Sequence, residues 1–132
     1  MTAKIIKRFN LRINSSTKNI KMEIVCSTDS KYIMPTGIML LSLFESNRGE
    51  VVNVHLLHDH DSAALLDPIR AIAASYQQNI HFYLINDDIF EHFPIGLDFQ
   101  LDHVGTSFAT YYRLYLAEIL PADIDKVIYL DG

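Results

Sequence analysis

Residues 22–29 read M-E-I-V-C-S-T-D, an apolar run that ends in small polar residues and an acid. Such a run is typical of a buried strand, and the polar residues after it are typical of a loop at a strand end. The single cysteine, Cys26, lies inside the run, which excludes an internal disulfide and predicts a small buried side chain. We therefore predict that Met22–Ser27 is the first strand of an α/β domain.

Helix-like and strand-like segments alternate after this strand. Their order, β-α-β-α-β-α-α-β, predicts a mostly parallel sheet covered by helices with right-handed crossovers. In the second helix, Asp67-Pro68 is interpreted as a second helix start rather than a kink. The predicted helices are Ile33–Phe44, Ser62–Tyr76, Asp87–Glu91 and Thr106–Leu120, the later strands are Val51–Leu57, Ile80–Ile85 and Lys126–Asp131, and Phe93–Val104 is a predicted loop.

The length and charge of the chain bound its class. A chain of 132 residues has room for one domain, which we place at 22–132 after a basic N-terminal extension at 1–21. No apolar stretch approaches the roughly 20 residues of a membrane span, and no secretory signal precedes the domain, so we expect a cytoplasmic protein. The first 22 residues carry a charge of +6, and the remainder carries −11.

This uneven charge favours some kinds of binding partner and argues against others. The acidic body argues against nucleic-acid binding, because phosphate contacts would have to come from the short basic extension alone. The extension could instead contact an anionic membrane, as a peripheral protein at the inner face of the cytoplasmic membrane. The alternative is a solvated leader, or an edge strand around Ile5–Ile13.

Acidic and polar residues follow the predicted strands. Ligands of parallel sheets bind beyond the carboxyl ends of the strands, near the point where strand order reverses. The five glycines are too scattered for a G-x-G-x-x-G or G-x-x-x-x-G-K-[ST] loop, which argues against a dehydrogenase or a P-loop enzyme. A receiver-like domain would need a pair of acids where Asp29 stands alone. The acids and polar residues at the strand ends are Asp29, His58–Asp61, Asn86–Asp88 and Asp131.

Three blocks carry a resemblance to a known family. They are I-V-C-S-T-D-S-K-Y at Ile24–Tyr32, A-T-Y-Y-R-L-Y-L-A-E-I-L-P at Ala109–Pro121 and D-K-V-I-Y-L-D at Asp125–Asp131. In this order they resemble family 8 glycosyltransferases, which are retaining enzymes that include bacterial lipopolysaccharide galactosyl- and glucosyltransferases. The resemblance covers residues 21–132 and implies a Rossmann-like nucleotide-diphospho-sugar transferase (GT-A) fold.

The resemblance also implies site residues. Arg113 matches the arginine of the family's Y-x-R-L helix, beside the donor sugar and diphosphate, and is the candidate catalytic residue. Asp131 matches the first aspartate of the D-x-D motif, which binds manganese or magnesium. The implied contacts of the UDP-sugar are Ser27, Asp29, Lys31, Tyr32, Ser107, Tyr111 and Asp131.

The implied activity is transfer of a hexose from UDP-glucose or UDP-galactose to a glycan or lipopolysaccharide acceptor. The chain ends at Gly132, inside the D-x-D motif, so we expect a fold truncated after the strand that leads into the motif. Because the second aspartate and the later metal ligand of the family are missing, we expect this chain to be inactive alone. The alternative is a non-catalytic remnant that binds nucleotide weakly or self-associates through its exposed sheet edge.

Each candidate also has a purely structural interpretation. Asp29 could cap the helix that follows it, Arg113 could be a surface arginine, and Asp131 could be an ordinary strand end. The tyrosines of the Thr106–Leu120 segment are interpreted as core packing rather than a stacking platform. The sequence His58-Asp59-His60-Asp61 has the composition of a metal site, but the family has a plain connection at this place.

Overall fold

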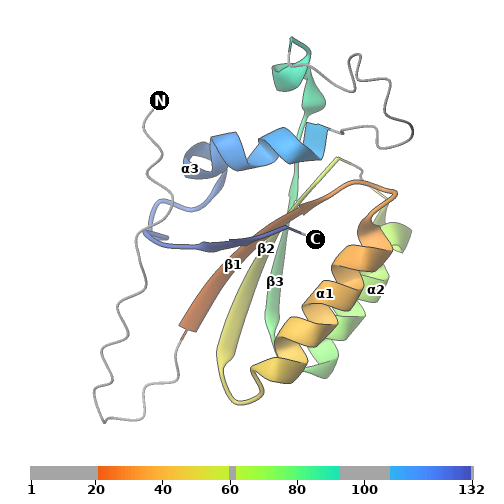
Figure 1. Ribbon diagram of the computed structural model, residues 1–132, viewed down its shortest axis with the longest axis vertical. Coiled ribbons are helices and arrows are strands. Elements are labelled where there is room, and N and C mark those ends of the chain that lie inside the picture. Colours follow the sequence, from red (N-terminus) through yellow and green to blue (C-terminus); the bar gives the residue numbers. More distant parts are fainter. Residues whose placement is uncertain (1–20, 60–61, 93–107, 132) are drawn as a thin grey trace.

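The computed structural model describes residues 21–59, 62–92 and 108–131 (Figure 1). The basic residues 1–20, the predicted loop Phe93–Val104 and Gly132 lie outside the described residues, so the expectations for them stay predictions. The described elements are β1 (Lys21–Thr28), α1 (Ile33–Ser46), β2 (Val51–His58), α2 (Ala63–Ser75), β3 (Asn79–Leu84), the 3₁₀ helices η1 (Asp87–Phe90) and η2 (Phe108–Tyr115), α3 (Leu116–Ile119) and β4 (Ile128–Leu130).

The four strands form one parallel sheet in the order β3-β2-β1-β4, which confirms the α/β class and the parallel sheet. The whole of β1, from Lys21 to Thr28, pairs with β2. On its other side β1 pairs with the short β4 alone, from Ile24–Ile128 to Cys26–Leu130. The chain therefore runs outward from β1 to β3 and then returns across β1 to place β4 on the opposite side.

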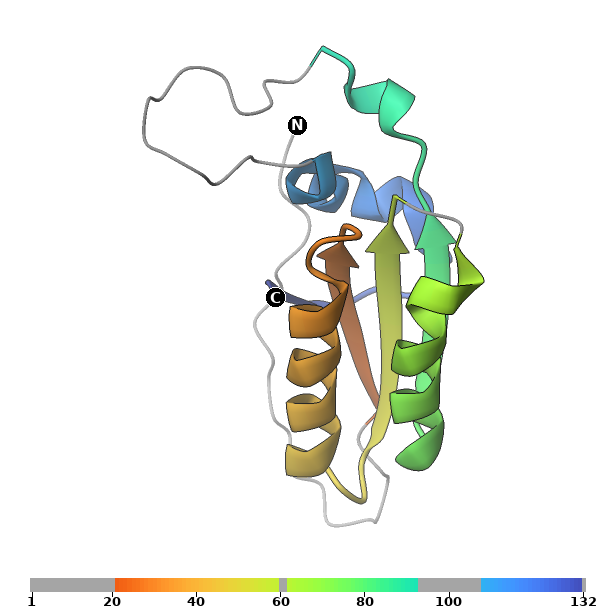
Figure 2. The ribbon, with the colours of Figure 1, turned by 90° about the vertical axis from the view of Figure 1, so that its right-hand side faces the viewer.

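The two faces of the sheet pack against different helices (Figure 2). Side chains such as Ile24 and Leu56 point toward α1 and α2 and form one core with them. Val25 and Leu57, one residue further along each strand, point to the other face and pack against η1, η2 and α3. This alternation follows from the two-residue period of a strand. Cys26 is buried in the first core as predicted, and burial raises the pKa of its thiol to about 12.

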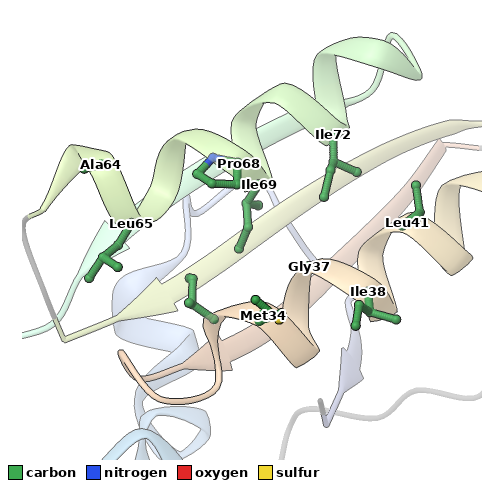
Figure 3. Close-up of a pocket in the computed structure, with 10 residues that line it drawn as sticks. Met34, Gly37, Ile38, Leu41, Ala64, Leu65, Pro68, Ile69 and Ile72 are labelled. Carbon is green, nitrogen blue, oxygen red and sulfur yellow. The ribbon is translucent and has the colours of Figure 1, made fainter.

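Helices α1 and α2 pack side by side and leave an apolar groove of about 270 Å³ on their outer surface (Figure 3). Gly37 of α1 lies in the groove, facing Ile69 and Ile72 of α2. A Cβ added at Gly37 would lie 3.7 Å from Ile72 Cδ1 and 3.8 Å from Ile69 Cγ1, which is ordinary van der Waals contact. Glycine at this position is therefore not required by the helix packing.

The segment before β4 differs from the α-helix predicted over Thr106–Leu120. Phe108–Tyr115 is a 3₁₀ helix, and only Leu116–Ile119 is α-helical. In a 3₁₀ helix residues three apart lie directly above one another, and here Tyr112 and Tyr115 both contact Phe90, with ring centroids 5.5 and 5.3 Å away. Packing of these rings around Phe90 accounts for the tighter helix, since aromatic residues have only moderate α-helix propensity.

Helix α2 is continuous from Ala63 to Ser75, so the predicted second start at Asp67-Pro68 is wrong. Pro68 is the sixth residue of the helix, and it forgoes only the hydrogen bond to the carbonyl of Ala64. Both residues are exposed, so water can replace that bond. None of the described helices is long and apolar enough to cross a membrane.

A buried polar network crosses three strands on the face opposite α1 and α2. His55 is 3% exposed, and its Nε2 lies 2.8 Å from Glu23 Oε2 while its Nδ1 lies 2.9 Å from the Tyr83 hydroxyl. Glu23 Oε1 accepts a hydrogen bond from Asn53 and pairs with Lys21. Burial raises the pKa of Glu23, but its bonds to His55, Asn53 and Lys21 outweigh burial and lower the pKa below 4.5.

Replacement of Gly37 by alanine is expected to stabilise the protein. The added methyl group fits the groove, and alanine is better than glycine in a helix interior, so Gly37→Ala should raise the free energy of unfolding by about 0.5–1 kcal/mol. Gly49→Ala is the matched control: Gly49 has φ +92°, so alanine should destabilise by about 1 kcal/mol. Urea denaturation of the three proteins measures both, and a destabilised Gly37→Ala would contradict the packing described here.

The polar network predicts a pH-dependent contribution from Glu23. Because its pKa is lowered in the folded state, the stabilisation is present above pH 4.5 and is lost as pH falls through the folded pKa. Glu23→Gln should cost about 1–3 kcal/mol of unfolding free energy at neutral pH. The difference from the wild type should shrink below pH 4.5, as measured by urea denaturation across pH. The exposed control Glu118→Gln should change stability by less than about 0.5 kcal/mol throughout.

Candidate functional site at the carboxyl ends of β1 and β4

The strand order makes the carboxyl ends of β1 and β4 neighbours, and we call the space beyond these two ends the crevice. The chain leaves β1 toward β2 on one side of the sheet and returns to β4 on the other, so the strand order reverses here. This is the switch point at which parallel sheets bind ligands. Of the predicted strand-end acids, Asp29 follows β1 and Asp131 follows β4, and both therefore lie at this crevice. Figure 1 shows the end of β4 beside β1.

Asp29 holds the loop between β1 and α1. Its Oδ1 accepts hydrogen bonds from the backbone N–H groups of Lys31, at 2.9 Å, and Tyr32, at 3.0 Å. The residue is 7% exposed, and its own carbonyl accepts a further bond from the Tyr32 N–H. The alternative that Asp29 caps α1 is therefore wrong, because the N-cap of α1 is Tyr32 and Asp29 instead caps the turn before the helix. Among the described residues, no hydrogen bond goes to Oδ2, which remains available to a ligand.

A side-chain hydrogen bond joins β1 to β4. Ser27 Oγ lies 2.7 Å from the Tyr129 hydroxyl, so Ser27, one residue beyond the last backbone pair Cys26–Leu130, is tied diagonally to Tyr129, which pairs with Val25 inside the ladder. Ser27 is among the donor contacts expected from the sequence, whereas Tyr129 is not, although Tyr129 lies in the block that ends at Asp131. A polar residue two positions before a strand-end acid was the available signal, since such residues share one face of a strand.

Two charged side chains act on the Tyr129 hydroxyl. Burial raises its pKa most, and its hydrogen bond with Ser27 lowers it. The carboxylate of Asp131 raises the pKa further, whereas the guanidinium of Arg113 lowers it. Because Coulomb interactions weaken with distance, these effects indicate that both charges lie near Tyr129. Arg113 of η2 and Asp131, which follows β4, therefore both act on the Tyr129 hydroxyl.

Two cationic side chains belong to the segments near this end of the sheet. Lys31 and Arg113 are exposed, and within the described part of the chain no ion pair engages either of them. By contrast, Arg48 pairs with Glu45, and Arg70 lies over the Phe82 ring. The ring of Tyr32 is 45% exposed next to Asp29. The loop after β1 and the η2 helix thus carry an acceptor, an exposed tyrosine and two cations without carboxylate partners among the described residues.

The remaining candidates have other positions. Ser107 lies outside the described residues. Tyr111 is half-buried and its ring stacks on Phe90 at 6.3 Å, while Tyr112 is fully buried, so the interpretation of the tyrosines as core packing is confirmed. His58 is buried at the end of β2, with its ring edge against Phe82. His60 and Asp61 are not described, and the described residues contain no cluster of three metal-ligating side chains.

Comparison of the sequence with models of known protein families identifies the family of the chain. The model of glycosyl transferase family 8 matches residues 23–132. The chain belongs to this family. The match includes the ends of β1 and β4 and the η2 helix, and it confirms the resemblance found in the sequence. The family match therefore includes both strand ends that border the crevice.

Curated relatives of the chain are named as lipopolysaccharide glycosyltransferases. The chain is 28% identical over 119 residues to the lipopolysaccharide glucosyltransferase WaaO of Escherichia coli K12, with 88% of this chain and 32% of that protein covered. It is 23% identical over 112 residues to a lipopolysaccharide 1,3-galactosyltransferase of Salmonella typhimurium, covering 85% of this chain and 31% of that one. The chain therefore spans about a third of the length of these curated relatives.

Solved structures confirm the fold. The galactosyltransferase LgtC, crystallised with donor and acceptor sugar analogues, has a TM-score of 0.70 and 30% identity, covering 83% of this chain and 37% of LgtC. The bifunctional glycosyltransferase WbbM is similar in fold alone, with a TM-score of 0.60, 16% identity and coverage of 89% and 20%. The expected GT-A type fold is therefore confirmed.

The two oxygens of Asp29 predict a separation of stability from ligand binding. Asp29→Ala removes the acceptor of two backbone N–H groups and should lower the free energy of unfolding by about 1 kcal/mol. Asp29→Asn keeps an amide oxygen at the Oδ1 position and should lose much less. Thermal or urea denaturation of both variants measures this, and equal losses would show that the carboxylate charge, rather than the capping oxygen, stabilises the loop.

Proposed function

We propose that this chain is the donor-binding part of a retaining glycosyltransferase that moves a hexose from UDP-glucose or UDP-galactose to a glycan acceptor. The observation that supports the proposal is that Asp29 and Asp131 follow the neighbouring strands β1 and β4, while Arg113 and Asp131 both act on Tyr129 of β4. LgtC, which has the same fold, was crystallised with donor and acceptor sugar analogues. In the proposed assignment, residues 22–132 form the donor-binding half-domain and residues 1–21 an extension.

The end of β1 is proposed to bind the uracil base. Uracil presents an N3–H donor, and Asp29 Oδ2 is an acceptor that no described residue uses. The exposed ring of Tyr32 lies beside it and offers an apolar face on which a planar base can stack. Base recognition then depends on a loop that Asp29 itself holds through Oδ1.

The other side of the crevice is proposed to bind the diphosphate. Arg113 carries a planar fork of donors that suits phosphate oxygens, and Lys31 supplies a second cation. Asp131 would hold a manganese or magnesium ion together with the diphosphate, because such ions are commonly bound by one or two carboxylates plus substrate phosphates. The bound ion supplies charge neutralisation for the leaving diphosphate. Arg113 would offset the same developing charge without a proton transfer.

The acceptor and the location of the protein follow from the relatives. The relatives are named as lipopolysaccharide glucosyl- and galactosyltransferases, so the proposed acceptor is lipopolysaccharide or another surface glycan. Synthesis of such glycans on the cytoplasmic side of the membrane suits a peripheral protein. The five basic residues among the first 20, Lys4, Lys7, Arg8, Arg12 and Lys18, would contact the anionic lipid surface, at about 1 kcal/mol each near that surface.

Calorimetric titration of the chain with UDP in the presence of Mn²⁺ tests the proposal. In Asp29→Asn, Oδ1 keeps its bonds to the loop, so Nδ2 takes the place of Oδ2 and opposes the uracil N3–H with a second donor. We expect this variant to keep its stability and to bind UDP about tenfold more weakly. Arg113→Ala should weaken binding at least as much, because a charge-assisted phosphate contact is lost.

Arg70→Ala is the matched control for Arg113→Ala. Arg70 lies on α2, over the Phe82 ring and away from the β1–β4 crevice, so its loss should leave UDP affinity unchanged. No binding by the wild-type chain at millimolar UDP would contradict the proposal. Equal weakening by Arg70→Ala and Arg113→Ala would show that net charge, rather than the crevice, attracts the nucleotide.

A further inference from the structure

The strand pair that forms the crevice has little backbone pairing. Strand β4 is three residues long, and its ladder with β1 ends at Cys26–Leu130. Among the described residues, the 2.7 Å hydrogen bond between Ser27 and Tyr129 is the one side-chain bond between β1 and β4, and it runs diagonally from Ser27, just past the ladder, to Tyr129, which pairs with Val25. It links residues 102 positions apart in the chain.

The bond lies close to both acids along the chain. Asp29 lies two residues after Ser27, and Asp131 lies two residues after Tyr129. Residues two apart in an extended chain share one face and lie about 7 Å apart. Because Tyr129 pairs with Val25, the bond reaches diagonally from β4 to the part of β1 that extends past the ladder and leads to Asp29.

The surroundings of Tyr129 favour a defined position for its hydroxyl. Tyr129 packs against the core that contains Val25 and Leu116. Its hydroxyl is near both Arg113 and Asp131, as the opposite effects of these groups on its pKa indicate. For a half-buried hydroxyl with a short hydrogen bond, moving away breaks that bond, which costs free energy.

We propose that Tyr129 is a positioning residue that, through its hydrogen bond with Ser27, sets the distance between the nucleotide-binding end of β1 and the metal-binding end of β4. The inference rests on the proposed function. It changes the role expected for Ser27, whose hydroxyl acts through Tyr129 rather than on the donor. A ligand that spans both strand ends, such as UDP with a bound divalent ion, depends on this distance. A ligand held by one end does not.

The test compares UDP binding with Mn²⁺ and with EDTA, by calorimetry on the full chain. The dissociation constant in EDTA divided by the dissociation constant in Mn²⁺ measures how much the metal tightens UDP binding. Asp131→Asn removes the proposed metal ligand and gives the lowest value expected for this ratio. Tyr129→Phe keeps the ring and removes the hydroxyl, so the ratio should fall by about two- to tenfold while affinity in EDTA is retained. Ser27→Ala should act in the same way, and the double variant should be no worse than either single variant.

Tyr83→Phe is the matched control, since it also removes one tyrosine hydroxyl with a hydrogen bond, here to His55 on β2. It should leave the ratio unchanged. Equal weakening in Mn²⁺ and EDTA by Tyr129→Phe would indicate a merely structural role and overturn the inference, as would additive effects in the double variant. A wild-type chain that binds UDP without gain from Mn²⁺ also overturns it. Absence of UDP binding by the wild type refutes the proposed function itself, and the inference with it.

Discussion

The pairing of β4 with β1, on the side opposite β2, is the constraint on which the rest of the molecule depends. Without it, the ends of β1 and β4 would not be neighbours, and Asp29 and Asp131, which are 102 positions apart in the chain, would have no common crevice. The pairing also directs the 3₁₀ helix that carries Arg113 across the sheet face before the chain reaches β4. One strand order thus gathers three segments of the chain, the ends of β1 and β4 and the η2 helix, at the candidate site.

The two faces of the sheet differ in the side chains that they bury. The face under α1 and α2 is an apolar core. The opposite face has an apolar core at η2 and α3 and a polar network around Glu23 and His55. The network lies on β1, β2 and β3, whereas the crevice lies between β1 and β4. Strand β1 is common to both, so its amino-terminal half contributes to a stabilising network and its carboxyl end to the site.

Sequence patterns predicted most of the fold because most of it follows local periodicity. Strands β1 to β4 and helix α1 lie close to their predicted places, since each is a run of apolar residues with a clear period. The 3₁₀ helix at Phe108–Tyr115 was predicted as α-helix because its geometry depends on contact with Phe90, which is distant in the chain. Pro68 was misread for a similar reason: a general propensity was outweighed by its exposed place early in α2.

The candidate site was predictable as a set of strand-end residues, but not as a geometry. Parallel strands end at one edge, so Asp29 and Asp131 were expected there. The link between them was not, because nothing local in the sequence pairs Ser27 with Tyr129. The same limit applies to His55, whose partners Glu23 and Tyr83 lie on two neighbouring strands. Register across a sheet decides such contacts, and register comes from the whole fold.

The two oxygens of Asp29 have a consequence for judging which members of this lineage remain active. Since Oδ1 supports the loop before α1, selection for folding alone would keep an acid or amide here after catalysis had been lost. An intact Asp29 is therefore poor evidence of a working enzyme. Arg113 and Asp131 are exposed and make no described hydrogen bond that folding needs. Substitution of those two residues in a relative that retains Asp29 would indicate a protein that has kept the fold and lost catalysis.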